Sequence, residues 1–192
     1  KPPRDLNEWQ RRDLSVLWHP CTQMAEHPDT LPLLPICSGQ GIWLEDINGK
    51  RYIDAISSWW TNLFGHAEPR IAKAISDQAH TLEHVIFAGF SHKPGLELAE
   101  RLTAIAPKGL SRVFYADNGS AAVEIALKMS FHSFVNQGIH GRTKFMALGN
   151  SYHGETLGAL SMADIPLYRE VYAPLLLAPM FAPSPDYFNK QA

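Results

Sequence analysis

A strand that leads directly into a Gly-Ser helix start is the feature that most constrains this chain. Ser111 to Asn118 is predicted to form a strand, and Gly119-Ser120 then opens a helix that runs on through Ala121 to Val135. A glycine at a strand exit lets the backbone approach a ligand closely, and we expect Ser120 to cap the helix. The free N–H groups and the dipole of such a helix start favour an anion, most often a phosphate. A simple helix cap is the alternative interpretation of the same residues.

A second strand exit follows about thirty residues later. Lys144 to Leu148 is predicted to form a strand, and the loop after it ends in Tyr152-His153-Gly154. Tyr152 can lay its aromatic face against a flat ring, although an aromatic side chain at such a position also serves in plain packing. Ligands in open α/β sheets bind beyond the carboxyl ends of the strands. Two such exits at one sheet edge therefore predict a site for a phosphorylated, planar cofactor.

The order strand, helix, strand indicates an α/β fold with a mainly parallel sheet and right-handed crossovers. Residues 1–66 are predicted to form a separate N-terminal segment, an arm followed by a β-hairpin. Residues 1–40 are rich in proline, so we expect this arm to be irregular and to lie on a neighbour. Residues 67–192 are predicted to be the first part of a larger domain, which looks unfinished where the sequence ends.

The hairpin and two of the helices have clear local signals. Gly41 to Leu44 and Arg51 to Ile56 are predicted to pair across a turn that contains Asn48-Gly49, a strong hairpin signal. Pro69 and Pro94 each open a stretch whose apolar residues recur at helical spacing.

Composition excludes several classes of protein. The chain has 192 residues, 45% hydrophobic and 19% charged, with a net charge of −2, so nucleic-acid binding has no electrostatic support. An apolar run of about 18 residues, as a membrane span needs, does not occur. The start of the sequence lacks the apolar core of a signal peptide, and the two cysteines, Cys21 and Cys37, fit a reducing compartment. We therefore expect a cytoplasmic protein, and the prolines between the cysteines argue against a bridge.

Two patterns resemble catalytic motifs but have simpler explanations. His80, Glu83 and His84 match a zinc-peptidase spacing, yet no third ligand is identifiable, so no metal is expected. Lys128 has Glu124 four residues before it on the same predicted helix, which favours a surface salt bridge over a cofactor-bearing lysine.

Adjacent tryptophans, Trp59 and Trp60, follow the hairpin directly. One interpretation is core packing for both, because exposed tryptophan is unfavourable. The other is that one of them forms the wall of an apolar substrate pocket.

Taken together, these residues resemble the class III, fold type I aminotransferases that use pyridoxal 5′-phosphate, and in particular the branch that acts in biotin synthesis. The resemblance covers nearly the whole chain but corresponds only to the first part of such enzymes. The residues that carry it are Trp18-His19-Pro20, Thr22, Met24, Ser57-Ser58-Trp59-Trp60, His84-Val85-Ile86-Phe87, Ala116-Asp117-Asn118-Gly119-Ser120 and Tyr152-His153-Gly154.

The resemblance implies a role for each matched position. Gly119 and Ser120 would bind the cofactor phosphate, and Tyr152 would stack on the pyridine ring and border the substrate. Trp59 would contact the apolar chain of the substrate. Cys21 stands where the family has an aromatic residue that helps to bind both substrates, and a thiol cannot stack on the adenine of S-adenosylmethionine, so the amino donor stays open.

The family's Schiff-base lysine lies beyond the matched part, so we expect no catalytic residue in these 192 residues and no activity from them alone. The resemblance implies small-molecule substrates and a homodimer whose sites are built from two chains. Another class III ω-amino acid aminotransferase, or a non-catalytic module for cofactor binding or dimerisation, are the alternatives.

Overall fold

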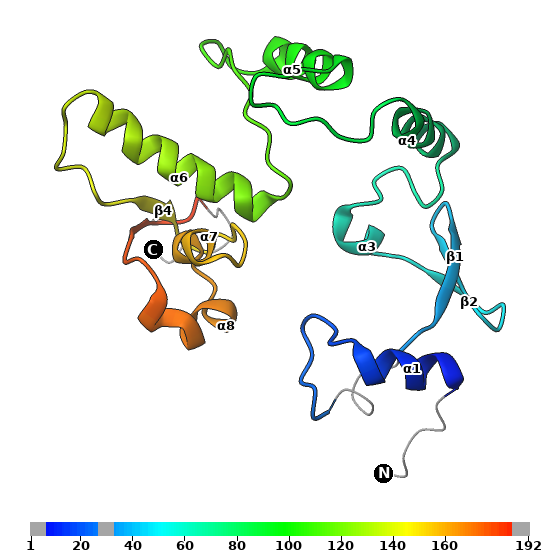
Figure 1. The fold of residues 1–192 in the computed structure, drawn as a ribbon. Helices are drawn as coiled ribbons and strands as arrows, with labels where there is room; N and C mark the ends of the chain where they lie inside the picture. Colours follow the sequence, from blue (N-terminus) through cyan, green and yellow to red (C-terminus); the bar gives the residue numbers. More distant parts are fainter. Residues whose placement is uncertain (1–6, 27–32, 186–192) are drawn as a thin grey trace. The chain divides into compact units, whose positions relative to one another are not determined.

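The computed structural model describes residues 7–26 and 33–185 (Figure 1). The chain divides into two compact units, Lys1–His92 and Lys93–Ala192, which are described separately below. The boundary between these units does not coincide with the predicted domain boundary between residues 66 and 67, which stays a prediction. The expected unfinished tail falls on residues 186–192, outside the described residues.

The first unit begins with a helix that the sequence analysis missed, α1 (Glu8–Val16). Asn7 and Gln10 form a capping box: the Gln10 N–H donates to Asn7 Oδ1 at 2.9 Å, and the Asn7 N–H donates to Gln10 Oε1 at 3.0 Å. These two bonds satisfy donors that a helix start otherwise leaves unpaired. The expectation of an irregular arm over residues 1–40 is therefore wrong for this stretch.

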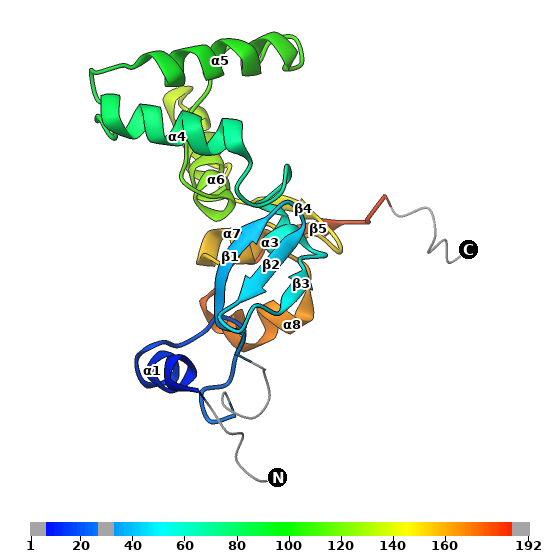
Figure 2. The ribbon, with the colours of Figure 1, turned by 90° about the vertical axis from the view of Figure 1, so that its right-hand side faces the viewer.

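A three-stranded antiparallel sheet follows, in the order β1-β2-β3, and Figure 2 shows the strands side by side. Its strands are β1 (Ile36–Gln40), β2 (Trp43–Asp46) and β3 (Arg51–Ile53). The hairpin of β2 and β3 confirms the prediction. β1 was not predicted, because its sequence lacks alternation and its pairing with β2 is what makes it a strand.

Asp46 holds the hairpin turn. Its Oδ1 accepts hydrogen bonds from the N–H groups of Asn48 at 2.9 Å and Lys50 at 3.0 Å, and its Oδ2 accepts one from the Tyr52 hydroxyl at 2.9 Å. These bonds lower the pKa of Asp46, although its burial acts in the opposite direction. Gly49 has a φ of +78°, a conformation that glycine adopts freely.

Two helices complete the described part of the first unit, α3 (Ser57–Trp60) and α4 (Pro69–Thr81). Helix α4 begins at the predicted proline, and the Glu68 side chain caps it by accepting from the Ile71 N–H at 2.9 Å. Pro69 has no N–H to leave unpaired, so it suits the first position of a helix.

The second unit contains the predicted second and third helices and a short parallel sheet. Its elements are α5 (Lys93–Ile105), α6 (Gly119–Asn136), β4 (Met146–Leu148), α7 (Leu157–Met162), α8 (Pro166–Arg169), the 3-10 helix η1 (Glu170–Leu175) and β5 (Met180–Ala182). β4 and β5 pair in parallel, and helix α6 packs on α7 (Figure 1).

One predicted strand does not form. Residues 111–118 have no regular secondary structure, and the strand predicted from Ser111 to Asn118 is therefore wrong for this structure. A strand needs a neighbour for its backbone hydrogen bonds, and β4 pairs only with β5 among the described strands.

The buried apolar side chains of the described residues gather on α7 and just after it. They are Ala159, Leu160, Met162 and Ala163, with Ser161 buried between them. Within residues 7–26 and 33–185, no helix is long and apolar enough to cross a membrane.

Candidate functional site

The first two residues of α6 carry N–H groups without a hydrogen-bond partner in the described part of the chain. Asn118, not Ser120, caps this helix, because its side-chain oxygen accepts from the Ala121 N–H at 2.8 Å. The expectation that Ser120 is the cap is therefore wrong, and its hydroxyl is left for another partner. A Cβ placed on Gly119 would meet no atom within 4 Å, so the space beside this residue is open.

The loop that contains Tyr152-His153-Gly154 lies against this helix start. The Glu155 N–H donates to Ser120 Oγ at 3.3 Å. Gly154 has a φ of +117°, and a Cβ built on it would overlap the Ser120 hydroxyl. Glycine is therefore required where the loop crosses the helix, and the structure brings the two sequence motifs together.

Tyr152 has an accessible ring beside this contact. Its side chain is half exposed, and its hydroxyl donates to Glu155 Oε1 at 3.0 Å. The ring of Tyr168 lies next to it, with ring centroids 5.6 Å apart and planes tilted by 57°. This geometry fixes one edge of the Tyr152 ring and leaves much of the side chain open to solvent.

Glu124, one turn further along α6, ties this helix to α7. Its Oε1 accepts from the N–H groups of Gly158 at 2.7 Å and Ala159 at 3.3 Å. A hydrogen bond from the Thr156 side chain is the main reason that the pKa of Glu124 is lowered, against its burial, and the two N–H groups add to it. The predicted Glu124–Lys128 salt bridge is not among the ion pairs of the described residues, so that expectation is wrong, although the charge of Lys128 adds a smaller contribution to the lowered pKa.

In the first unit, Trp59 lies in a turn of left-handed backbone. The four residues of α3 have φ values of +49° (Ser57), +48° (Ser58), +60° (Trp59) and +66° (Trp60). Trp59 is 58% exposed and Trp60 is 81% exposed. Core packing therefore does not explain either tryptophan within the unit that contains them.

The carboxylate of Asp54 contacts this turn. Asp54 Oδ2 accepts from Ser58 Oγ at 2.7 Å and lies 2.9 Å from His66 Nε2. The N–H and then the hydroxyl of Ser58 are the main causes that lower the pKa of Asp54 to about 2, and the His66 ring adds to them while burial opposes them. Asp54 is therefore ionised at neutral pH, and His66 Nε2 carries the hydrogen in their contact.

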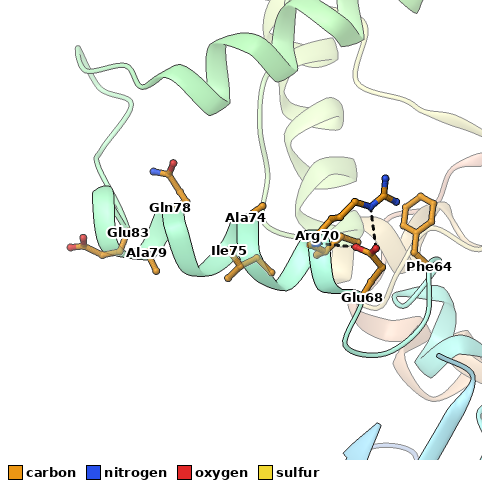
Figure 3. Close-up of a pocket in the computed structure, with 9 residues that line it drawn as sticks. Phe64, Glu68, Arg70, Ala74, Ile75, Gln78, Ala79 and Glu83 are labelled. Atoms are coloured by element: carbon orange, nitrogen blue, oxygen red, sulfur yellow. Dashed lines mark hydrogen bonds and ion pairs between the residues drawn. The ribbon is translucent and has the colours of Figure 1, made fainter. Parts of the chain in front are cut away.

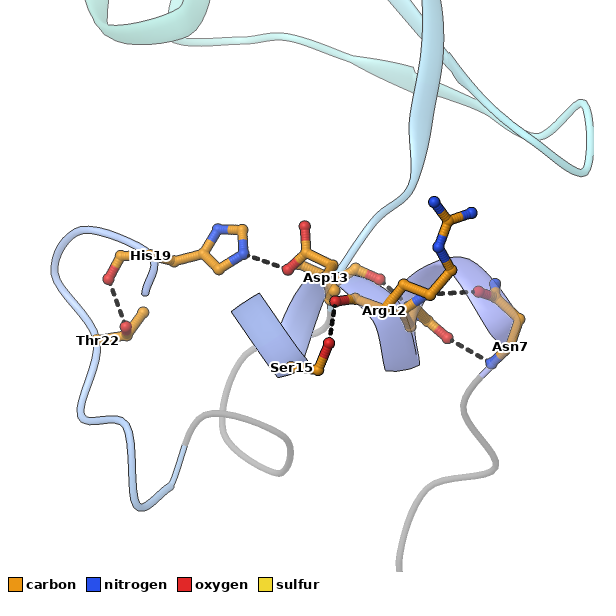
Figure 4. A network of polar contacts seen from close by, with 8 residues as sticks. Asn7, Arg12, Asp13, Ser15, His19 and Thr22 are labelled. Atoms are coloured by element: carbon orange, nitrogen blue, oxygen red, sulfur yellow. Dashed lines mark hydrogen bonds and ion pairs between the residues drawn. The ribbon is translucent and has the colours of Figure 1, made fainter. Parts of the chain in front are cut away.

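A short polar network joins α1 to His19 and Thr22, the residues on either side of Pro20 and Cys21 in the sequence (Figure 4). His19 Nε2 lies 2.5 Å from Asp13 Oδ1, and Thr22 Oγ1 donates to the His19 carbonyl at 2.6 Å. Trp18 Nε1 donates to the Thr22 carbonyl at 3.3 Å. Cys21 has a φ of +56° and, like Cys37, is exposed with a free thiol.

A pocket of about 620 Å³ runs along α4 (Figure 3). Apolar side chains line much of it, and Arg70 Nε donates to Glu68 Oε1 at 3.1 Å at one end. Its lining residues are Phe64, Glu68, Arg70, Ile71, Ala74, Ile75, Gln78, Ala79 and Glu83. None of the predicted site residues belongs to it.

The structure does not place His80 and His84 on one helix, as the zinc-peptidase spacing would require. Helix α4 ends at Thr81, so His84 lies beyond it, and His80 Nδ1 donates to the Ser76 carbonyl at 2.8 Å. Three or more His, Cys, Asp or Glu side chains that could hold a metal gather nowhere in residues 7–26 and 33–185.

Comparison with protein families decides the family. The model of the class III aminotransferases matches residues 24–192. The chain belongs to the class III aminotransferases. Among curated relatives, the adenosylmethionine-8-amino-7-oxononanoate aminotransferase of Helicobacter pylori is 51% identical over 174 residues, covering 90% of this chain and 39% of that protein. The enzyme of the same name from Aquifex aeolicus is 40% identical over 189 residues, covering 98% of this chain and 41% of that protein.

Solved structures of class III aminotransferases have the same fold as this chain. The adenosylmethionine-8-amino-7-oxononanoate aminotransferase of Methanocaldococcus jannaschii superposes with a TM-score of 0.86 at 42% identity, covering 94% of this chain and 41% of that one. An ω-transaminase of Pseudomonas jessenii in complex with PMP gives the same TM-score at 31% identity, covering 95% and 40%. The chain thus spans about two-fifths of the length of these relatives, and its α/β fold is that of the family.

Sequence reasoning missed the structural roles of three residues in or beside these aminotransferase motifs: Asn118 as the helix cap, Glu124 as the link to α7, and Asp54 as the support of the Trp59 turn. Asn118 is a common capping residue that directly precedes Gly119, which was a usable signal. The partners of Glu124 are 34 and 35 residues away in the sequence, so no local pattern could have revealed them.

Proposed function

We propose that the full-length protein is a pyridoxal 5′-phosphate enzyme of biotin synthesis. It would transfer an amino group from S-adenosylmethionine to 8-amino-7-oxononanoate and so give 7,8-diaminononanoate. The relatives named adenosylmethionine-8-amino-7-oxononanoate aminotransferase match most of this chain. Their sequence identities to the chain are higher than that of the ω-transaminase.

The contact between Glu155 and Ser120 carries the cofactor proposal, because it joins the start of α6 to the loop with the half-exposed Tyr152 ring. Two unpaired N–H groups at the start of α6 and open space beside Gly119 suit a phosphate. Ser120 Oγ already accepts from the Glu155 N–H, and its own hydrogen is available to a phosphate oxygen. Tyr152 would stack on the pyridine ring.

Bound pyridoxal phosphate supplies the electron sink for amino-group transfer. In this proposal the described residues bind and orient: Gly119 and Ser120 hold the phosphate, and Tyr152 holds the ring and borders the substrate. Trp59 contacts the apolar chain of the substrate, and Cys21 lies near the amino donor. No residue of this chain is assigned to proton transfer.

We further propose that the protein acts in the cytoplasm as a homodimer. Many large apolar side chains of the described residues are exposed, among them Phe64, Ile75, Ile86 and Phe90. Exposed apolar surface of this extent is typical of protein–protein contacts. Light scattering of the full-length protein tests the proposal, which a monomer would contradict.

Purified full-length protein tests the activity directly. It is incubated with pyridoxal phosphate, 8-amino-7-oxononanoate and S-adenosylmethionine, and 7,8-diaminononanoate is measured by mass spectrometry. Lysine and other amines replace S-adenosylmethionine in parallel reactions, which identify the donor. Turnover of ω-amino acids without turnover of 8-amino-7-oxononanoate would establish the ω-transaminase alternative, and cofactor binding without any turnover would establish a non-catalytic module.

A further inference from the structure

We propose that Asp54 is a positioning residue that holds the Ser57–Trp60 turn, and with it Trp59, in the conformation that the substrate site needs. Its enzymatic consequence rests on the proposed function. The structural part rests on contacts within the first unit alone.

The turn needs an external support because of its backbone. All four residues from Ser57 to Trp60 have φ between +48° and +66°, and none of them is glycine. Left-handed backbone is unfavourable for residues other than glycine, and where it occurs it is usually confined to a single position. Such a run persists only where the surrounding structure fixes it.

The tryptophans do not supply that support. Trp59 and Trp60 are both largely exposed within their unit, so their side chains bury little area that could offset the backbone conformation. Their directions therefore follow from the backbone and from whatever holds it.

Asp54 supplies the support through both its backbone and its side chain. Its carbonyl accepts from the Ser57 N–H at 3.2 Å, and its carboxylate accepts from the Ser58 hydroxyl at 2.7 Å. The low pKa of Asp54 means that the carboxylate stays charged at neutral pH, and hydrogen bonds to charged groups are stronger than neutral ones.

The same carboxylate joins the turn to the sheet. Its partner His66 is bonded to Gly41 in both directions, by the His66 N–H at 2.8 Å and the Gly41 N–H at 3.0 Å. The side chains of Asp54 and His66 are only 7% and 15% exposed, so water competes little for this contact. Asp54 thus links the left-handed turn, through His66, to the backbone between β1 and β2.

Fluorine NMR of the full-length protein labelled with 5-fluorotryptophan tests the turn without any need for activity. Single Trp→Phe variants assign the resonances of Trp59 and Trp60. In Asp54→Asn and Asp54→Ala, we expect these two resonances to shift or broaden while those of Trp9 and Trp18 stay. Asp54→Asn carries the test if the alanine variant does not fold.

Two further variants separate positioning from general destabilisation. Asp46→Asn removes an equally bonded carboxylate at the hairpin turn and is expected to affect Trp43 but not Trp59 or Trp60. Ser57→Gly in the Asp54→Asn background makes left-handed backbone more favourable at a residue that bonds Asp54 through its backbone N–H, which glycine keeps. This second change is therefore expected to restore the Trp59 resonance in part.

The enzymatic readout compares the change in KM with the change in kcat. In Asp54→Asn, we expect KM for 8-amino-7-oxononanoate to rise about tenfold while kcat changes about twofold or less, as for a displaced substrate-positioning group. Unchanged Trp59 and Trp60 resonances in both Asp54 variants would overturn the inference. A wild-type protein that lacks turnover would overturn the proposed function and leave the NMR result to decide the inference.

Discussion

Gly154→Ala is expected to weaken cofactor binding strongly. Alanine at the φ of +117° found here is unfavourable by about 1–3 kcal/mol. Its Cβ would also overlap Ser120, whose own Cβ and Cα would lie 2.9 and 3.1 Å away. Because those neighbours belong to helix backbone and its first side-chain atom, the loop must move rather than Ser120.

That movement breaks the Glu155–Ser120 hydrogen bond, a contribution of about 1 kcal/mol. If the loop must return to its native place to bind the cofactor, it regains that bond, so the net cost is the backbone strain and the Cβ overlap less about 1 kcal/mol. A net cost of about 1–2 kcal/mol raises the Kd for pyridoxal phosphate about 5- to 30-fold. Titration of the full-length apoprotein, followed by absorbance of the bound cofactor, measures this constant.

Gly138→Ala is the matched control. Gly138 also has a positive φ, +74°, but a Cβ there would meet nothing within 4 Å. It lies just beyond the far end of α6, so its variant is expected to lose stability without losing cofactor affinity. A Kd for Gly154→Ala within about twofold of the wild-type value would refute the proposed closeness of loop, helix start and cofactor.

Three other predictions follow from the site. Cys21→Tyr restores an aromatic face worth about 1 kcal/mol in stacking and is expected to lower KM for S-adenosylmethionine several-fold in steady-state assays; an unchanged KM would mean that another group stacks on the adenine or that the donor is different. Glu124 has a lowered pKa in the folded protein, so its stabilising effect is present at neutral pH and is lost as the pH falls through the folded pKa; Glu124→Gln is expected to flatten the acid side of the Tm–pH curve, which an unaltered curve would contradict. Borohydride reduction of the 192-residue chain with pyridoxal phosphate is expected to label no lysine stoichiometrically, as measured by peptide mass spectrometry. Specific labelling of Lys128 would contradict the expectation that these residues contain no cofactor-bearing lysine.

Local sequence signals correctly predicted helices α4 and α6 and the hairpin, which depend on interactions between residues close together in the sequence. Pro69 begins α4, the Asn48-Gly49 turn joins β2 to β3, and α6 runs through the predicted stretch. The strand expected at residues 111–118 was wrong because a strand depends on a partner elsewhere in the chain. β1 was missed for the converse reason, since pairing with β2 gives an unpatterned sequence its conformation.

The candidate site shows the same limit at the level of side chains. The sequence placed Ser120 and Tyr152 at one edge, and the Glu155–Ser120 contact shows that their segments meet. It assigned Glu124 to the nearest cation, whereas the carboxylate binds N–H groups that only the tertiary fold brings to it. The left-handed turn at Trp59 has no sequence signature at all, because it consists of residues that seldom adopt that conformation.

The short-range bonds of Asp46 bear on the order in which the first unit folds. Tyr52, its most distant partner, is six residues away, whereas the bridge between Gly41 and His66 closes a loop of 25 residues. The longer closure costs about 1 kcal/mol more in chain entropy. The hairpin is therefore expected to form early and the His66 bridge late, so the loop that carries the two tryptophans is the last part to assemble and the first to open, as its amide hydrogen exchange would report.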